Sequence, residues 1–115
     1  MVRPVMRQGA TSNDVASHIT NILRRETIMY HVYILLLKNK KLYTGFTEDL
    51  IRRKEEHDDG KVKSTRNLLP VKLLHYESYL LKTDAMRREK FLKTTEGKRL
   101  LKMQIRDILV IEGVI

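Results

Sequence analysis

Four side chains with useful chemistry lie in residues 31–57, HVYILLLKNKKLYTGFTEDLIRRKEEH. Tyr33 and Tyr43 supply two phenols. Arg53 supplies a planar fork of donors that suits a phosphate, and His57 supplies an imidazole that can move a proton near neutral pH. Arg53 and His57 are four residues apart, so on a helix they share one face. The group still lacks an acid that could hold a metal.

Glu89 is the acid that the rest of the chain offers. It falls on one helical stripe with Ala85 and Leu92, at i, i+4 and i+7, where an apolar residue is expected. A carboxylate that faces a core is costly unless it is paired or bound to a cation. Two explanations stay open: a salt bridge to a nearby arginine, or a ligand for Mg²⁺, which prefers hard oxygen donors.

Three strands are expected to carry or support these residues. Residues 32–37 are apolar on both faces, which predicts a central strand that is covered on both sides. Residues 39–41 suit a hairpin turn, and residues 42–46 form the return strand. The third strand is expected at about residues 71–79. Its two faces would carry alternate residues: Val71, Leu73, His75, Glu77 and Tyr79 on one, and Lys72, Leu74, Tyr76, Ser78 and Leu80 on the other.

The geometry of the hairpin follows from parity. Side chains alternate between the faces of a strand. Tyr33 and Tyr43 therefore share a face only if the connecting loop has an odd number of residues, or if a bulge intervenes. They can then approach each other only diagonally. Gly45 lies on the face of Tyr43, where a missing side chain would let a phosphate or the next helix approach the backbone.

A charged helix is expected at residues 48–57. Thr47 suits its N-cap, Leu50 and Ile51 are expected to anchor it to the sheet, and Gly60 suits its C-terminal position.

Two further helices are expected near the C-terminus. The first begins at Asp84 with Thr83 as its cap, and the second begins at Thr95. The apolar face of the second helix is expected to contain Leu101, Ile105 and Ile108. The apolar tail at residues 108–115 either completes the core or makes a dimer contact.

Residues 1–28 are read as an N-terminal extension ahead of one domain at residues 29–115. Helical spacing of apolar residues predicts a short amphipathic helix at about residues 13–25. Four interpretations stay open: a helix packed on the domain, a loosely held basic arm, upstream sequence before a start at Met29, or an Arg-rich transit peptide.

Composition narrows the class of protein. The chain has 115 residues, which suits one domain. Its net charge of +9 favours a polyanionic partner, with nucleic acid as the first candidate, although a soluble basic surface has the same composition. The absence of cysteine excludes disulfides and thiolate metal sites. The longest apolar run, residues 32–37, is too short to span a membrane, and a cytoplasmic location is expected, with the nucleoid as its site in a prokaryote.

Five basic residues are expected to contact nucleic acid. Three of them belong to a basic, hydroxyl-rich loop that suits a phosphodiester backbone and equally suits solvent. The five are Lys41, Lys61, Lys63, Arg66 and Lys93.

Over about residues 30–97 the chain resembles a GIY-YIG nuclease domain. It is most similar to the small stand-alone members, which are related to the N-terminal nuclease domain of the UvrC excision-repair protein. HVY at residues 31–33 stands in place of GIY, and YTG at residues 43–45 in place of YIG. The arginine, histidine and glutamate of the family match Arg53, His57 and Glu89.

The resemblance implies a three-stranded antiparallel sheet flanked by helices, an α/β fold of the α+β type. It also implies a metal-dependent endonuclease that hydrolyses DNA phosphodiester bonds, structure-selective and linked to repair or recombination. Glu89 would bind one Mg²⁺ or Mn²⁺, and Arg53 would neutralise charge on the phosphate. Tyr33 or Tyr43 would position or deprotonate the attacking water, and His57 would be a second proton carrier.

Phe46 departs from the family pattern, because UvrC-type domains carry a lysine in that position. Lys41 or Lys93 could take the place of that lysine. Family members usually take their specificity from an attached domain. A homodimer partner or another protein is expected to supply it here.

The alternative function is a non-catalytic nucleic-acid-binding module with the same fold. A third is an interaction subunit that docks through its apolar tail or N-terminal helix.

Overall fold

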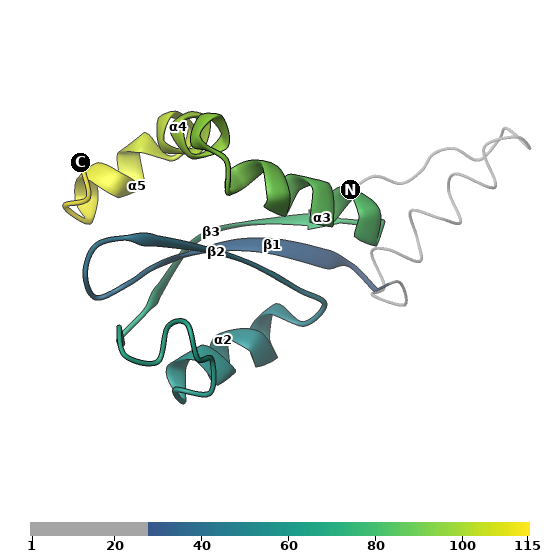
Figure 1. Cartoon of the computed structure of the whole chain (residues 1–115), viewed down its shortest axis with the longest axis horizontal. Coiled ribbons are helices and arrows are strands. Elements are labelled where there is room, and N and C mark those ends of the chain that lie inside the picture. The colour runs from purple at the N-terminus through teal and green to yellow at the C-terminus, as the bar shows by residue number, and fades with distance from the viewer. Residues whose placement is uncertain (1–27) are drawn as a thin grey trace, which may run out of the picture.

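The computed structural model describes residues 28–115, and these residues form a three-stranded antiparallel sheet with helices on both faces (Figure 1). The strands are β1 (Tyr30–Leu36), β2 (Leu42–Thr47) and β3 (Lys72–Tyr79). Their order is β2-β1-β3, so β1 is central and β2 and β3 are edge strands. The predicted fold class and the central position of the first strand are confirmed. The helix expected at residues 13–25 lies outside the described residues.

The helices divide between the two faces of the sheet. α2 (Leu50–Asp58) covers one face. α3 (Lys82–Leu92), α4 (Thr95–Gln104) and α5 (Arg106–Ile111) follow one another across the other face (Figure 1). Within residues 28–115, none of the helices has the length and apolar character that crossing a membrane requires.

β1 contributes to two separate cores because its side chains alternate between the faces. Val32 and Ile34 are buried on the side of α3 and α4. Tyr33 and Leu35 are buried on the side of α2, beside Val71. This two-sided burial explains why the strand is apolar at every position.

The hairpin satisfies the parity condition. Leu36 pairs with Leu42, so residues 37–41 form the connection, which is an odd number of residues. Tyr33 pairs with Gly45, and Tyr43 pairs with Leu35 two positions along β1. The two tyrosines therefore share the face of α2 and lie diagonally to each other, as predicted.

β3 contains an irregularity that the alternation in the sequence did not predict. Ile34 of β1 pairs with His75, whereas the next residue, Leu35, pairs with Leu73. Leu74 is thus an extra residue, and the faces exchange on either side of it. Leu73 packs in the α2 core, and His75 points to the side of α3.

The predicted helix caps were partly wrong. Asp49, not Thr47, is the N-cap of α2, because its carboxylate accepts a hydrogen bond from the backbone N–H of Arg52. The hydroxyl of Thr47 instead accepts from the backbone N–H of Asp49. Gly60 follows α2 with a φ of +74°, in the left-handed region that favours glycine, as predicted.

Two predictions about the later helices were also wrong. Thr83 does not cap α3, because the helix begins at Lys82 after Leu81, which makes no side-chain cap bond. The last predicted helix is divided at Ile105 (φ −109°, ψ 31°) into α4 and α5. After this division the chain changes direction, and Leu109 is fully buried in the core. Ile108, which was predicted to be on the apolar face, is only half-buried.

The anchoring of α2 differs from the prediction as well. Leu50 packs against the core on this face of the sheet. Ile51 does not, since 76% of it is exposed.

A hydrogen-bonded carboxylate fastens α3 to β3. Glu77 accepts hydrogen bonds from Arg88 Nε (2.8 Å), from the Tyr79 hydroxyl (2.7 Å) and from His75 Nε2 (3.0 Å). Burial alone raises the pKa of this carboxyl. The hydrogen bonds from Arg88, Tyr79 and His75 outweigh it and lower the pKa of Glu77 to about 2.

This network predicts an acid-dependent loss of stability. The carboxyl of Glu77 titrates near 4.5 when unfolded and near 2 when folded, so its contribution is full above pH 4.5 and is lost as the pH falls toward 2. At about 1.4 kcal/mol per pKa unit, the free energy of unfolding should fall by about 3 kcal/mol over this range. Urea unfolding of wild type and Glu77→Gln between pH 7 and pH 2.5 measures it. Glu77→Gln should be less stable than wild type at pH 7. Its free energy of unfolding should fall by about 3 kcal/mol less than that of wild type as the pH is lowered.

The control variant is Glu55→Gln, which removes an exposed carboxylate of α2 that forms no salt bridge within residues 28–115. It should follow the wild-type curve. If the free energy of unfolding had the same pH dependence in wild type and Glu77→Gln, the lowered pKa of Glu77 would be contradicted.

Candidate active site beside the edge strand

Tyr33 is at the centre of the predicted site. Only 2% of it is exposed. Its hydroxyl lies 2.9 Å from His57 Nε2 and accepts a hydrogen bond from Arg53 Nε at 3.4 Å. Strand β1 and helix α2 therefore bring three of the predicted residues into one hydrogen-bonded group.

Gly45 makes room for the ring of Tyr33. A Cβ atom at Gly45 would lie 2.2 Å from Tyr33 Cζ and 2.3 Å from the Tyr33 hydroxyl oxygen. The sequence predicted that a phosphate or the next helix would use the space above Gly45. The structure shows that the phenol ring fills it, and that Tyr33 leans across β2 toward the open edge of the sheet.

His57 is held at both ring nitrogens. The residue is 0% exposed, and its Nδ1 lies 2.8 Å from the hydroxyl oxygen of Thr65, which is equally buried. Two proton arrangements satisfy the group: Tyr33 donates to Nε2 while Nδ1–H donates to Thr65, or both bonds are reversed. In either arrangement the imidazole of His57 connects Thr65 to Tyr33, and Tyr33 in turn is hydrogen-bonded to Arg53.

Thr65 was not predicted as a site residue, because it lies in the basic loop that was expected to face solvent or nucleic acid. The available signal was Val62, an apolar residue three positions earlier. Val62 is also buried, and its carbonyl accepts the backbone N–H of Thr65 at 3.1 Å. The loop thus turns inward at these two residues.

The pKa values of the group follow from this burial. Burial raises the pKa of Tyr33 to about 12, and the hydrogen bond from Arg53 opposes the increase only in part. Burial also lowers the pKa of His57, and the charge of Arg53 lowers it further. At neutral pH Tyr33 is a protonated phenol and His57 a neutral imidazole that can accept a proton.

Tyr43 completes the cluster from β2. Its ring centroid lies 6.2 Å from that of Tyr33 and 5.2 Å from that of His57. Unlike these two, Tyr43 is only half-buried. It is therefore the phenol of the cluster that a molecule in solution can reach more easily.

Arg53 is also partly accessible, with 34% of its side chain exposed. Its guanidinium NH1 donates to Glu56 Oε1 at 3.0 Å. The hydrogen bond with Tyr33 raises the pKa of Arg53, so this cation stays charged. The fork is thus fixed by Tyr33 and Glu56 beside the half-buried phenol.

Glu89 comes from α3, on the opposite face of the sheet from α2. Its carboxylate pairs with Lys93 Nζ at 3.1 Å, so the expected arginine partner was wrong. Leu92, one turn along α3, lines a hollow together with Thr44 of β2, which places this side of the helix near the edge strand. The charge of Glu89 contributes to the raised pKa of Tyr33, after burial and Tyr43, and therefore acts across the sheet.

The residues present fit a metal site with one protein carboxylate. Within residues 28–115, no group of three or more His, Asp or Glu side chains could enclose a metal ion. Mg²⁺ commonly keeps several waters and binds one or two carboxylates together with substrate phosphates. Glu89, with 22% of its side chain exposed, is suited to that role.

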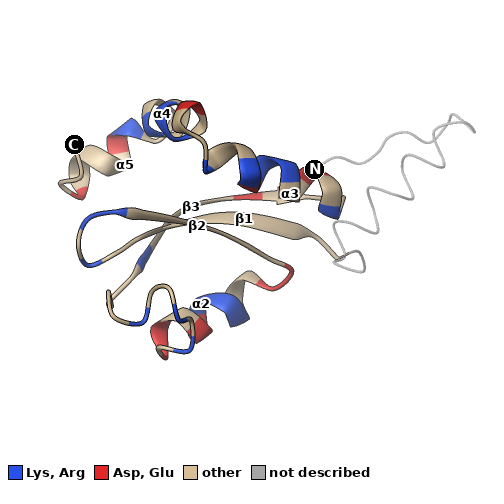
Figure 2. Ribbon diagram, in the orientation of Figure 1, with Lys and Arg blue, Asp and Glu red and all other residues tan. Residues whose placement is uncertain are grey.

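Lys and Arg residues are spread over the helices and loops of the described chain (Figure 2), and the five that were predicted to contact nucleic acid come from separate elements. Lys61, Lys63 and Arg66 are exposed on the loop that follows α2. Lys41 is exposed at the end of the hairpin, and Lys93 is paired with Glu89. Of these five, Lys93 is the one that forms a salt bridge with a residue predicted to be catalytic.

Comparison with known proteins gives a consistent family match. A family model described as GIY-YIG catalytic domain matches residues 29–103. A UPF0213 protein of Halobacterium salinarum is 47% identical over 62 residues, which are 53% of this chain and 80% of that protein. A UPF0213 protein of Haloquadratum walsbyi is 39% identical over 82 residues, which are 69% of this chain and 92% of that protein.

A solved structure is also similar. It is the solution NMR structure of the UPF0213 protein BH0048 from Bacillus halodurans, which is 35% identical. The match covers 67% of this chain and 85% of that one, with a TM-score of 0.46.

The buried hydroxyl of Thr65 predicts a specific cost on substitution. Thr65→Val keeps the shape but leaves His57 Nδ1 without a partner, which should lower the free energy of unfolding by about 1–3 kcal/mol. Ser64→Ala removes the neighbouring exposed hydroxyl and should change it by less than about 0.5 kcal/mol. Urea unfolding at pH 7 compares the two. Equal effects of the two substitutions would show that the Thr65 hydroxyl does not hold His57.

Proposed function

Because this chain belongs to the GIY-YIG catalytic domain family, we propose that it is a metal-dependent endonuclease that hydrolyses phosphodiester bonds in DNA. The observation that carries the proposal is the buried hydrogen-bonded group that joins Thr65, His57, Tyr33 and Arg53. It places a fixed cation and a neutral proton acceptor behind the half-buried phenol of Tyr43. In the hydrolysis of a phosphate diester, a cation can stabilise the charge that develops on the phosphate, and a proton acceptor can take a proton.

In this proposal Arg53 binds the phosphate that is cut. Its planar fork matches two phosphate oxygens. Tyr33 and Glu56 already fix the guanidinium, so little side-chain entropy is lost when the substrate binds. Arg53 stabilises the negative charge that develops on the phosphate during attack.

The two tyrosines have different roles. Tyr43 is more accessible and orients the attacking water. Tyr33 is buried and protonated at neutral pH, and it orients Arg53. His57 is the group that can accept a proton, and because it is fully buried it reaches the substrate only through Tyr33.

Glu89 would hold the divalent ion, Mg²⁺ or Mn²⁺. The bound ion would supply positive charge that polarises the phosphate and stabilises the leaving oxygen. Lys93 must then release the carboxylate of Glu89, and its ammonium group becomes available to a phosphate of the substrate. The net charge of +9 supports a nucleic-acid substrate.

The resemblance to the nuclease domain of an excision-repair protein supports a role in DNA repair or recombination, on branched or damaged DNA. A second copy of the chain, or another protein, would supply the choice of target.

A second candidate function is a nucleic-acid-binding module that does not cut. Two observations favour it: Tyr33 is almost completely buried, and Glu89 is already paired with Lys93. Such a module would bind DNA with a strong salt dependence and leave it intact in the presence of Mg²⁺.

Replacing the carboxylate of Glu89 tests the proposed function. Wild type should cut nicked or branched DNA in Mg²⁺, and Glu89→Gln should cut at least about a hundredfold more slowly because one oxygen ligand becomes an amide. Gel assays on linear, nicked and branched DNA measure the rate. Glu55→Gln, an exposed carboxylate on α2, should cut at the wild-type rate. If no DNA is cut by wild type, or if Glu89→Gln cuts equally well, the nuclease proposal is wrong.

Removing one hydroxyl at a time should separate the tyrosines. Tyr43→Phe should cut at least about a hundredfold more slowly, since it loses the group that orients the water, and should unfold like wild type. Tyr33→Phe should also lose about 1–3 kcal/mol of stability, because His57 Nε2 is left buried without a partner. Single-turnover cleavage and urea unfolding give the two readouts. Equal stability losses in both variants would contradict these separate roles.

A further inference from the structure

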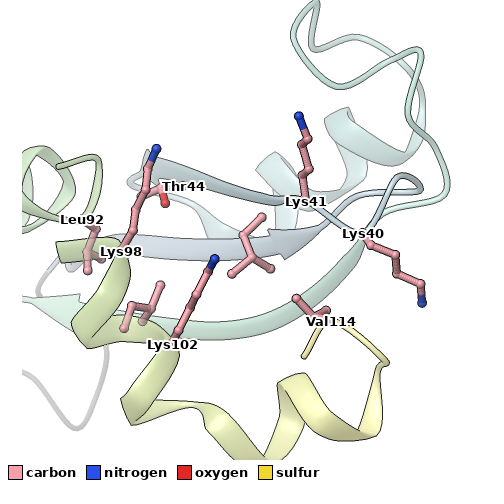
Figure 3. Close-up of a pocket in the computed structure, with 9 residues that line it drawn as sticks. Lys40, Lys41, Thr44, Leu92, Lys98, Lys102 and Val114 are labelled. Carbon is pink, nitrogen blue, oxygen red and sulfur yellow. The ribbon is translucent and has the colours of Figure 1, made fainter. Parts of the chain in front are cut away.

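A hollow of about 400 Å³ lies between the β1–β2 hairpin, the end of α3, α4 and the C-terminal residues (Figure 3). Its apolar lining includes Leu92, Leu101 and Val114. Lys98 and Lys102 reach it from α4, and Lys41 from the hairpin. We call this feature the lysine hollow. Lys41 is among the residues predicted to contact nucleic acid, whereas the two lysines of α4 were not predicted to do so.

Four lysines line the hollow; Lys41, Lys98 and Lys102 extend toward the same side of it, whereas the fourth, Lys40, points away (Figure 3). Lys40 donates to the backbone carbonyl of Glu112 at 2.8 Å. In the described part of the chain, Lys41, Lys98 and Lys102 form no salt bridge, in contrast to Lys93, which pairs with Glu89. Three cations without a carboxylate partner repel one another, and a bound anion would relieve that repulsion.

The apolar lining adds a second requirement. A free phosphate would gain nothing from leucine and valine side chains, but the sugar and base of a nucleotide would bury apolar surface against Leu42 and Val114, the half-buried members of the lining. The volume is also in the range that small-molecule sites occupy in proteins. The hollow thus fits a ligand that is anionic at one end and largely apolar at the other.

The position of the hollow connects it to the candidate active site. Thr44 lines the hollow, and the preceding residue, Tyr43, points to the opposite face of β2, toward the phenol cluster. On α3, Leu92 lines the hollow and its neighbour Lys93 pairs with Glu89. Since β2 is an edge strand, a nucleic-acid strand can pass around its free side from one face to the other.

We propose that the lysine hollow is a nucleotide subsite. It holds one nucleotide of the substrate strand next to the phosphate that is cut, with a phosphate on Lys41, Lys98 and Lys102 and the sugar and base on the apolar lining. The proposal rests on the proposed function, because the DNA substrate supplies the nucleotide. Binding by the subsite is nevertheless measurable without cleavage.

The first test compares two double variants that remove the same charge. Lys98→Gln/Lys102→Gln changes the hollow. Lys38→Gln/Lys82→Gln changes two exposed lysines outside the hollow, one in the connection after β1 and one at the first residue of α3. Fluorescence anisotropy of a labelled single-stranded oligonucleotide, in EDTA, gives the affinity over a range of salt concentrations.

The hollow variant should reduce the slope of log K against log salt by about two, or about one for each lysine that no longer binds a phosphate. It should also bind more weakly at every salt concentration. The control variant should keep the wild-type slope. Equal changes in the two variants, or no binding by wild type, would overturn the subsite. Both variants should unfold like wild type, since the four lysines are exposed.

The second test asks whether the apolar lining is used. Thymidine 3′,5′-bisphosphate is titrated into methyl-labelled protein. The methyl resonances of Leu101 and Val114 should shift in a saturable way, and those of Leu35, in the core on the α2 face, should not. The hollow variant should show none of these shifts. Unshifted Leu101 and Val114 resonances in wild type would overturn the subsite.

The outcomes separate the two proposals. A chain that shows the expected binding but cuts no DNA in Mg²⁺ overturns the nuclease function and keeps the subsite. If wild type cuts DNA but the two double variants bind the oligonucleotide equally well, the subsite proposal is wrong and the nuclease proposal stands.

Discussion

The hydrogen bond between Tyr33 and His57 is the interaction on which the candidate site depends. Both groups are almost completely buried, and buried polar atoms must find partners within the protein. One bond between a strand and a helix therefore imposes conditions on the surrounding chain. β2 must have no side chain where the phenol ring lies, and the loop after α2 must provide a hydroxyl for the second nitrogen of the imidazole. Arg53 is then held by a partner that cannot move.

The sheet divides the candidate site between two layers. The phenols, the guanidinium and the imidazole belong to the side of α2, whereas the carboxylate of Glu89 belongs to α3 on the other side. A site of this kind requires an edge strand near both layers, and β2, which has no further strand beside it within residues 28–115, is that strand. The small size of the domain helps, because with three strands the central strand is adjacent to an edge.

The sequence predicted the parts of the fold that depend on local pattern. The apolar run in β1 indicated burial on both faces, and parity predicted the diagonal arrangement of Tyr33 and Tyr43. The sequence did not predict the extra residue in β3, because the adjacent Leu73 and Leu74 were assigned to opposite faces of a regular strand, whereas the pairing shifts at Leu74. It also misplaced Ile51, since an apolar residue at the start of a helix is compatible with either face, and only packing against the sheet decides.

The site was predictable in its residue types but less so in its contacts. The spacing of Arg53 and His57 placed both on one face of α2, and the structure brings them to Tyr33. The partner of His57 comes from a loop, where no periodicity indicates which of several hydroxyls turns inward. Lys93 is four residues after Glu89, a spacing that permits a salt bridge on a helix. The spacing alone did not show that this pair forms.

The free side of β2 has a consequence for the behaviour of the protein in solution. An uncovered edge strand presents backbone donors and acceptors that a strand from another molecule can pair with, and proteins commonly protect such edges with lysine. Lys41 lies just before β2, and Lys98 and Lys102 lie near the same edge. A second molecule that approached by this edge would bring its own lysines against them. The same charges that suit a nucleic acid therefore also keep copies of this chain from joining strand to strand.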